Sequence, residues 1–351
     1  MALRALDTLP IAPGDRVLVR AQTDVPLENA DAAQLLRLET LRPTVDALVA
    51  RGARVALVGH RGRPSGRAQP DLSLAPLADD LARILARPVV FVGACVGEAV
   101  RTAIAGAAPD AVLLLENVRF HAEETSADPA VRRAFAEALA APFAAVVSDA
   151  FSVAHRAHAS MVELPVVRPS AAGVQMAREV EVLTAVRDAP RRPAVAIIGG
   201  AKIATKLPLI RALERHYDAV LVGGKVANEA LDEGLAFAPR VLLPTDFVGD
   251  REDIGPRTRA AFRAAIADAA TIVWNGPLGR FEDPAFAVAT EEIARAIAAA
   301  DGFTVVGGGE SVEVVEKLGL RDKMDFVSTG GGAMLDFLAG ATLPGVKALQ
   351  A

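Results

Sequence analysis

The sequence predicts an α/β fold with parallel sheets, divided into two domains. Short apolar runs alternate with helical segments along the whole chain, and this order is typical of parallel strands joined by crossover helices. The apolar runs are continuous, as expected for strands that helices cover on both faces of a sheet. Because 351 residues exceed what one hydrophobic core usually serves, we expect two domains.

In the first half, apolar runs predict five strands, and helical periodicity predicts helices beside them. The predicted strands are residues 16–20, 54–60, 88–93, 111–117 and 144–151, with helices near 34–50, 74–86 and 129–139. The alternation stops at residues 163–170, ELPVVRPS, where two prolines precede a long helical stretch at 173–186. Since prolines favour a stiff connector, we place the domain boundary here, between residues 1–165 and 166–342.

The second half repeats the alternation, and nearly every strand in it ends in glycine. The predicted strands are residues 194–200, 219–224, 240–244, 271–276, 303–309 and 325–332, and helices begin near Ile203, Lys225, Pro256, Ala285, Ser311 and Ala333. In open α/β sheets ligands bind beyond the carboxyl ends of the strands, where glycine lets the backbone approach a phosphate. The glycine turns therefore indicate a nucleotide site, with plain turn punctuation as the alternative.

Composition excludes several classes of protein. The net charge of −5, the pI near 5.7 and the aromatic share of 4% do not suggest a nucleic-acid partner or an anionic membrane. Cys95 is the only cysteine, which rules out an internal disulfide. No apolar run reaches the roughly 18 residues that a membrane helix needs, and we expect a soluble, cytoplasmic protein.

The first glycine turn carries two lysines. The strand of residues 194–198 breaks at Gly199-Gly200 and resumes as a helix that holds Lys202 and Lys206. A helix that opens after a strand offers free backbone N–H groups and the positive end of its dipole to an anion. The alternative is a tight turn with solvated lysines. A P-loop is disfavoured because Ala219 and Val226 occupy its required glycine and hydroxyl positions, and no complete GxGxxG occurs.

Basic side chains follow the strands of the first half, and an arginine starts its first helix. They are Arg20, His60, Arg63, Arg119, Arg156 and Arg37. A single arginine of this kind is usually a solvated loop residue, but several on one sheet edge would repel one another unless they held an anion. We expect a small acidic molecule there. A metal site at His155 and His158 is disfavoured because further ligands are lacking.

Glu310 follows three glycines, and a carboxylate beside a phosphate-binding turn can hold the Mg²⁺ that accompanies ATP. Its alternative role is that of an acid favoured by the helix dipole. An anion in one half, a nucleotide in the other, and Lys206 and Arg37 able to meet between them indicate phosphoryl transfer. No residue stands out as a general base, and a carboxylate acceptor needs none because it is already ionised.

Seven motifs then resemble those of the phosphoglycerate kinase family, in its order and over nearly the whole chain. They are GHRGRP, LLLENVRF, DAFSVAHRAHAS, IIGGAKIATK, VWNGPLGRFE, VVGGGES and FVSTGGGA. The resemblance implies two Rossmann-like domains joined by a hinge helix, with residues 343–351 packing back on the first domain. Because an acyl phosphate hydrolyses if water reaches it, we expect the domains to close on their substrates about a hinge near residues 164–175. It also implies reversible phosphoryl transfer between ATP and 3-phosphoglycerate, giving ADP and 1,3-bisphosphoglycerate, by a monomer that uses Mg²⁺ with ATP or ADP.

The resemblance assigns roles by position. Arg37, Lys202 and Lys206 would be catalytic. The acid would be bound by Gln22, Asp24, Arg37, His60, Arg63, Arg119 and Arg156. The nucleotide would be bound by Gly200, Ala201, Lys202, Lys206, Gly223, Gly224, Asn275, Pro277, Glu282, Gly307, Gly308, Gly309, Glu310 and Ser311, with a phosphate-binding turn at Gly330, Gly331 and Gly332 and with Mg²⁺ at Glu310.

The chain also departs from the family pattern. Gln22 replaces an aspartate, Asp24 replaces an asparagine, Thr205 replaces an aspartate, and Lys225 replaces a glycine. The segments at 234–244 and 248–254 are shortened. Two alternatives therefore remain beside a phosphoglycerate kinase. One is an acyl-phosphate kinase for a related acid, and the other is a catalytically impaired nucleotide-binding paralogue.

Overall fold

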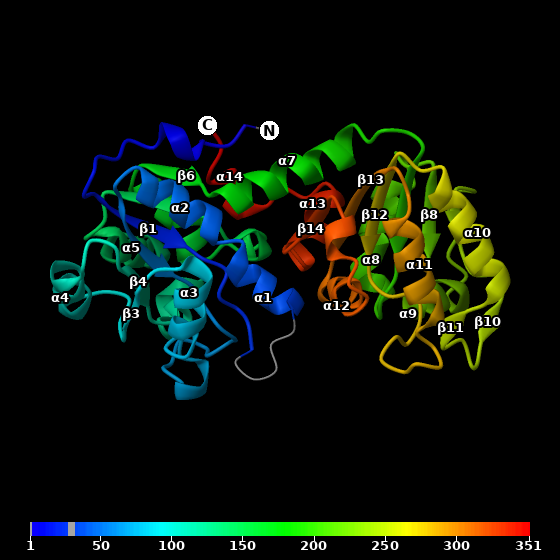
Figure 1. The fold of residues 1–351 in the computed structure, drawn as a ribbon, viewed down its shortest axis with the longest axis horizontal. Coiled ribbons are helices and arrows are strands. Elements are labelled where there is room, and N and C mark those ends of the chain that lie inside the picture. The colour runs from blue at the N-terminus through cyan, green and yellow to red at the C-terminus, as the bar shows by residue number, and fades with distance from the viewer. Residues whose placement is uncertain (1, 27–31) are drawn as a thin grey trace. The chain divides into compact units, whose positions relative to one another are not determined.

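A computed structural model describes residues 2–26 and 32–351 (Figure 1). The chain divides into two compact units, Met1–Val180 with Thr342–Ala351 and Glu181–Ala341. Each unit is built on one six-stranded sheet in which every pairing is parallel. The prediction of an α/β fold with two parallel-sheet domains is therefore confirmed. Among the described residues, no helix is both long enough and apolar enough to cross a membrane.

The sheet of the first unit has the strand order β3-β4-β2-β1-β5-β6. Its strands are β1 (Arg16–Arg20), β2 (Arg54–Val58), β3 (Val89–Val92), β4 (Val112–Leu115), β5 (Ala145–Ser148) and β6 (Ser170–Ala172). The chain leaves β1 toward β2 on one side, and β5 joins β1 on the other. The strand order thus reverses at β1, and ligands of open α/β sheets bind beside such a switch point.

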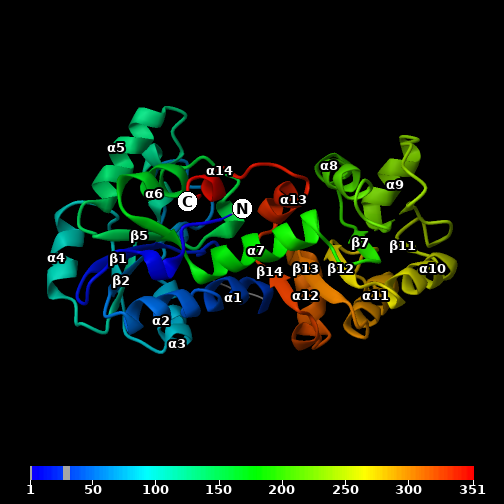
Figure 2. The ribbon, with the colours of Figure 1, turned by 90° about the horizontal axis from the view of Figure 1, so that it is seen from above.

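Both faces of this sheet are covered by helices, which explains the continuously apolar strands (Figure 2). Val17 and Val19 point to the face packed by α1 (Ala32–Glu39), α2 (Arg42–Ala50) and α3 (Leu77–Leu85). Leu18 points to the face packed by α4 (Glu98–Gly106), α5 (Pro129–Ala140) and α6 (Leu164–Val167). Successive side chains of a strand alternate between faces, so each strand needs apolar residues throughout.

Several elements differ from the prediction. The helix predicted over 34–50 is two helices, α1 and α2, because Pro43 at the start of α2 has no N–H to bond the preceding turn. Helix α4 and strand β6 were not predicted. Strand β6, Ser-Ala-Ala, carries no large apolar residue, so its sequence gave no strand signal, although it pairs with β5 through Val146, Val147 and Ser148.

The sheet of the second unit has the order β14-β13-β12-β7-β8-β9. Its strands are β7 (Ala194–Ile198), β8 (Ala219–Val222), β9 (Val241–Leu242), β12 (Thr271–Asn275), β13 (Phe303–Gly307) and β14 (Phe326–Ser328). Its helices are α8 (Ile203–Leu213), α9 (Gly224–Asp232), α10 (Pro256–Ala267), α11 (Val288–Ala298), α12 (Gly309–Lys317) and α13 (Gly332–Leu338). Figure 2 shows α8, α9 and α13 on one face and α10, α11 and α12 on the other. The switch point lies at β7, between β8 and β12.

Helix α7 (Val174–Asp188) begins against the end of β5. Asp149, which is fully buried one residue after β5, accepts hydrogen bonds from Thr44 Oγ1 at 2.6 Å and from the Met176 backbone N–H at 2.9 Å. Thr44 Oγ1 in turn accepts a bond from the Val174 N–H at 2.8 Å. These two side chains satisfy N–H groups that a helix start leaves free.

The two ends of the described chain lie side by side in the first unit (Figure 1). Leu3 and Gln350 form an isolated antiparallel β-bridge. The Arg4 side chain donates to the carbonyl oxygens of Gln350 at 2.9 Å and Ala348 at 2.6 Å. Just before, α14 (Pro344–Lys347) is fixed by the Gly345 N–H, which donates to Ala154 O at 2.9 Å. Residues near the C-terminus therefore complete the first unit.

Candidate active site

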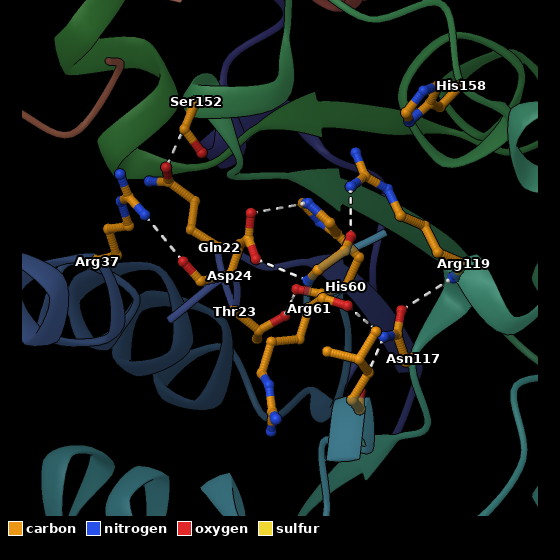
Figure 3. A network of polar contacts seen from close by, with 12 residues as sticks. Gln22, Thr23, Asp24, Arg37, His60, Arg61, Asn117, Arg119, Ser152 and His158 are labelled. Carbon is orange, nitrogen blue, oxygen red and sulfur yellow. Dashed lines mark hydrogen bonds and ion pairs between the residues drawn. The ribbon is translucent and has the colours of Figure 1, made fainter. Parts of the chain in front are cut away.

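In the first unit, polar side chains gather beyond the carboxyl ends of β1, β2 and β4 (Figure 3). Arg20 ends β1 and is fully buried, and His60 follows β2 with only 2% of its surface exposed. The Arg20 Nη2 lies 3.0 Å from His60 Nδ1. Burial lowers the pKa of Arg20 to about 10 and that of His60 to about 4, and the charges of Arg20 and Arg119 also lower the His60 pKa. His60 is therefore neutral at neutral pH.

Asp24 presents a half-exposed carboxylate to this cluster. Its Oδ1 accepts a hydrogen bond from the Gly62 N–H at 2.9 Å, and its Oδ2 lies 3.5 Å from His60 Nε2. Burial raises the pKa of Asp24, but the hydrogen bonds of His60 and Gly62 and the Arg119 charge outweigh it and hold the pKa below its usual range. Arg37 Nη1 donates to the Asp24 carbonyl oxygen at 2.8 Å. Arg37 and Asp24 are thus held together, as Figure 3 shows.

Arg119 adds a further positive charge. Its Nη1 donates to Gly62 O at 2.8 Å, and its buried Nε has no hydrogen-bond partner within the described part of the chain. Burial lowers the Arg119 pKa, and the nearby charges of Arg156 and Arg63 lower it further, while Asp24 and Glu124 raise it. Arg63 and Arg156 themselves are exposed. The predicted basic cluster therefore gathers around Arg119, with more positive than negative side chains.

Gln22 differs from the other predicted acid ligands because it is almost fully buried. Its Oε1 accepts a hydrogen bond from the Ser152 N–H at 3.3 Å. Of the two residues that depart from the family pattern here, Asp24 is the one with a half-exposed side chain. In residues 22–24 the negative charge is therefore carried by the Asp24 carboxylate.

In the second unit, the strand ends that flank the switch point pack backbone against backbone. The Gly199 N–H donates to Asn275 O at 2.9 Å, and the Gly200 N–H donates to Pro277 O at 2.9 Å. A Cβ on Gly199 would lie 2.0 Å from Pro277 O, and one on Gly276 would lie 2.4 Å from Gly199 C. Any side chain at these positions would push the turns apart, so packing requires glycine at both, and the positive φ of Gly276 also requires it by backbone conformation.

Lys206 lies close to the glycine turns that follow β7 and β12. It is buried, and its Nζ donates to Asn275 Oδ1. A Cβ on Gly200 would lie 3.9 Å from Lys206 Cε and 3.8 Å from Glu310 Oε2, so the ammonium and the carboxylate both approach Gly200. Burial lowers the Lys206 pKa to about 8, and the Glu310 charge opposes the shift. Lys206 is therefore still mostly protonated at pH 7.

A cavity of about 400 Å³ opens beside these residues. Six predicted nucleotide residues line it, namely Gly200, Ala201, Gly224, Pro277, Glu282 and Glu310. The remaining lining residues are Lys225, Asn228, Asp250, Arg251, Glu252, Gly279 and Arg280. Residues 250–252 form the turn between β10 (Phe247–Val248) and β11 (Asp253–Ile254), and the Arg280 N–H donates to Glu252 O at 2.8 Å. One wall of the cavity is thus a short hairpin, in a segment that the sequence indicates to be shortened.

The other predicted nucleotide residues lie outside the lining. Ser311 is buried, and its Oγ accepts a hydrogen bond from the Gly276 N–H at 2.6 Å, so it supports the turn after β12. Gly308 contacts Asn275, and Gly331 and Gly332 open α13. Lys202 is exposed at the start of α8, and the Thr205 hydroxyl donates to its carbonyl oxygen at 2.9 Å. Thr205 thus has a local role in the first turn of the helix.

Sequence reasoning missed the side chains that support the basic cluster from behind. Asn117 is fully buried, donates to Arg61 O and Leu72 O, and accepts from the Arg119 N–H. Glu124 and Ser160 are also fully buried. Asn117 belongs to the motif LLLENVRF, which would have been a signal, but Glu124 lies among polar residues and has none.

Comparison with known proteins adds independent findings. A family model described as phosphoglycerate kinase matches residues 7–234 and 244–341. Among curated relatives, the phosphoglycerate kinase of Moorella thermoacetica is 42% identical and is aligned over 95% of this chain and 96% of its own length. That of Salinispora tropica is 41% identical over the full length of both chains. This second alignment spans 398 positions, more than the 351 residues here, so parts of the relative have no counterpart.

Solved structures agree with the sequence relatives. The phosphoglycerate kinase of Pyrococcus horikoshii superimposes with a TM-score of 0.87 at 29% identity, and 99% of this chain and 98% of that chain are covered. The enzyme of Coxiella burnetii gives a TM-score of 0.81 at 30% identity, with 99% of both chains covered. The similarity therefore extends over both units.

Proposed function

The chain belongs to the phosphoglycerate kinase family, and from this premise we propose how its residues divide the reaction. The enzyme transfers a phosphoryl group between ATP and the carboxyl group of 3-phosphoglycerate. The observation that carries our assignment of residues is the pairing of a cationic cluster around Arg119 in one unit with a glycine-walled cavity beside Lys206 in the other. An anion and a nucleotide phosphate are the ligands that these two environments favour.

We propose that the basic cluster binds 3-phosphoglycerate. Arg63, Arg119 and Arg156 would face its phosphate and carboxylate, because guanidinium groups match such oxygens with paired N–H donors. Neutral His60 would donate a hydrogen bond from Nε2, and Asp24 would accept one from the hydroxyl group of the acid. The acceptor carboxylate is ionised at neutral pH, so the transfer requires no general base.

We propose that the nucleotide occupies the cavity of the second unit. Its phosphates would lie on the turn at Gly200 and Ala201, beside Lys202 and Lys206. Glu282, at the cavity lining, would bind the ribose. The backbone N–H groups at the starts of α8 and α12 would add positive potential, since helix N-termini favour anions.

The donor set fits Mg²⁺ that arrives with the nucleotide. Within residues 2–26 and 32–351, no group of three or more His, Cys, Asp or Glu side chains is placed to hold a metal by itself. Glu310 instead offers one carboxylate at the cavity. Mg²⁺ is commonly bound by one or two carboxylates together with substrate phosphates. When bound, the ion would neutralise phosphate charge.

In the transfer itself, Lys206 and Arg37 would stabilise the charge of the phosphoryl group in flight. Their side chains come from different units, so we propose that the two units close on the bound substrates about the hinge helix. Positioning and preorganised charge supply most of the catalysis in reactions of this kind. The Asn275 contact fixes the Lys206 ammonium before the substrates arrive.

A coupled assay tests the activity and the acid together. The pure enzyme should form 1,3-bisphosphoglycerate when ATP and 3-phosphoglycerate are both present. Added glyceraldehyde-3-phosphate dehydrogenase then reduces this product and oxidises NADH, which is measured. With a panel of small acids in place of 3-phosphoglycerate, ADP formation followed through pyruvate kinase and lactate dehydrogenase should give lower kcat/KM, because other acids lack either the phosphate or the hydroxyl group that the cluster would bind. Absence of turnover would indicate an impaired paralogue, and equal or better use of another acid would indicate a different acyl-phosphate kinase.

We propose that residues 1–165 with 343–351 bind the acid, and that residues 166–342 supply the hinge helix and bind the nucleotide. Hydrogen–deuterium exchange on the full chain tests this division. Saturating 3-phosphoglycerate should slow exchange after β1, β2 and β4, while an ATP analogue should slow it at residues 199–206 and 275–282. Protection of the same segments by both ligands would contradict the assignment.

We also propose that the enzyme works as a cytoplasmic monomer. Its one cysteine, Cys95, is a buried free thiol, as expected in a reducing compartment. Light scattering should give a mass near 36.5 kDa, and cell fractionation should recover the protein with cytoplasmic enzymes. A dimer mass or a membrane-bound fraction would contradict these two proposals.

A further inference from the structure

A line of buried polar groups runs behind His60, on the side away from Asp24. It consists of Glu124, Ser160 and Arg20, each of which is fully buried. Glu124 lies in the turn after Phe120, Ser160 lies in the π-helical segment Ala159–Glu163, and Arg20 ends β1. Three segments distant in sequence therefore meet behind one histidine. Polar groups buried this completely are retained only when their hydrogen bonds are satisfied.

Glu124 holds Ser160 by two hydrogen bonds. Its Oε2 accepts from the Ser160 backbone N–H at 2.9 Å, and its Oε1 accepts from the Ser160 hydroxyl at 2.6 Å. A hydroxyl has one proton, so this bond leaves Ser160 Oγ free to act only as an acceptor elsewhere. Arg20 Nε donates to that oxygen at 2.9 Å. With Glu124 ionised, the direction of each of these hydrogen bonds is therefore determined.

Arg20 in turn determines which ring nitrogen of His60 carries the proton. Its Nη2 lies 3.0 Å from His60 Nδ1, and a guanidinium group has only donors. Nδ1 must therefore be the unprotonated nitrogen, which places the ring proton on Nε2. Nε2 lies 3.5 Å from Asp24 Oδ2, as Figure 3 shows. The Thr23 hydroxyl donates to His60 O at 2.9 Å and holds the backbone of the same residue.

We propose that Glu124 and Ser160 are positioning residues, which hold Arg20 so that it fixes His60 as the neutral tautomer with its proton on Nε2. In this form His60 donates a hydrogen bond toward Asp24 and the acid, and adds no charge. The inference rests on the proposed role of this cluster in binding 3-phosphoglycerate. It concerns groups that do not touch the substrate and act through Arg20.

The tautomer can be measured directly by nitrogen NMR on the full chain with ¹⁵N-labelled histidine. A His60→Gln variant assigns the His60 signals among the five histidines. In the wild-type protein, Nδ1 should appear unprotonated and Nε2 protonated, with no titration between about pH 5.5 and 8, where a free histidine changes charge. A proton on Nδ1 would overturn the inference.

Ser160→Ala should disturb this state. Arg20 then loses an acceptor, so His60 should show a second tautomer or begin to titrate. KM for 3-phosphoglycerate should rise about tenfold with KM for ATP unchanged, the size expected for one weakened hydrogen bond to a charged group. Ser126→Ala is the matched control, because the half-buried Ser126 hydroxyl accepts a local bond from the Asp128 N–H at 3.2 Å. An unchanged tautomer and titration in Ser160→Ala would overturn the inference.

A second variant covers the case in which Ser160→Ala does not fold, as judged by circular dichroism. Glu124→Gln keeps the shape of the side chain but replaces one acceptor by a donor, so it should disturb His60 in the same way. The NMR result does not need turnover. If the enzyme were inactive on 3-phosphoglycerate but His60 showed the expected response, the proposed function would fail. The positioning role of Glu124 and Ser160 would still be supported.

Discussion

Replacing Lys206 with alanine is expected to lower kcat by about 10²–10³-fold, the usual effect of removing one preorganised group that stabilises transition-state charge. The Lys206 ammonium is buried, contacts Asn275 Oδ1 and approaches Gly200 from the same side as Glu310. In such a site a fixed positive charge is worth far more than in water. The coupled assay measures kcat, and thermal melting followed by circular dichroism checks that the fold is retained.

The control for this variant is Lys323→Ala, which removes an exposed lysine of the same unit and should leave kcat unchanged. Wild-type kcat/KM should also decline above about pH 8, because burial lowers the Lys206 pKa in the free enzyme to about 8 and the charge is lost as the pH rises through it. A folded Lys206→Ala enzyme with wild-type kcat would contradict the catalytic role.

Replacing Asp149 with alanine is expected to lower the free energy of unfolding by about 3 kcal/mol, since it leaves buried donors without an acceptor. The lost bonds come from Thr44 Oγ1 at 2.6 Å and from the Met176 N–H at 2.9 Å, at the start of α7. Urea denaturation measures the change. Asp110→Ala, at an exposed position, is the control and should change the free energy by less than about 0.5 kcal/mol. Equal losses in both variants would contradict the role of Asp149.

The same carboxyl should make stability depend on pH. Burial raises the Asp149 pKa to about 6, although its hydrogen bonds oppose the shift. The folded state thus holds the proton more tightly than the unfolded state, so the contribution is full below the ordinary value near 3.8 and is lost as the pH rises through about 6. Relative to Asp149→Asn, which does not ionise, the wild type should lose about 2.4 kcal/mol between pH 4 and 7. Parallel pH profiles would contradict this assignment.

The sequence was sufficient for the sheets because a strand buried on both faces must be apolar throughout. It was insufficient where a strand consists of small residues, as in β6, Ser-Ala-Ala, whose burial depends on β5 and on the first residues of the chain. The break between α1 and α2 was readable in principle from Pro43. Periodicity alone favoured one long helix, and the missing N–H decided the outcome.

For the site, sequence reasoning predicted side chains of the basic cluster and of the cavity lining, and missed those that support them. Arginine after a strand and glycine at a turn are visible signals, because their chemistry is unusual at those places. Glu124 and Ser160 are ordinary polar residues in the sequence and become significant only when folding buries them beside Arg20. Hydrogen-bond direction, which determines the tautomer of His60, depends on three segments meeting and cannot be read from any one of them.

The return of residues 342–351 to the first unit has a consequence for biosynthesis. During translation, residues 1–180 emerge well before the segment that holds Gly345 against Ala154 and Ala348 against Arg4. Domains generally fold as units while the chain is made. Here the first unit must remain without its last helix until all of residues 181–341 have been synthesised. The segment that completes the first unit therefore becomes available to it only after the whole second unit has been made.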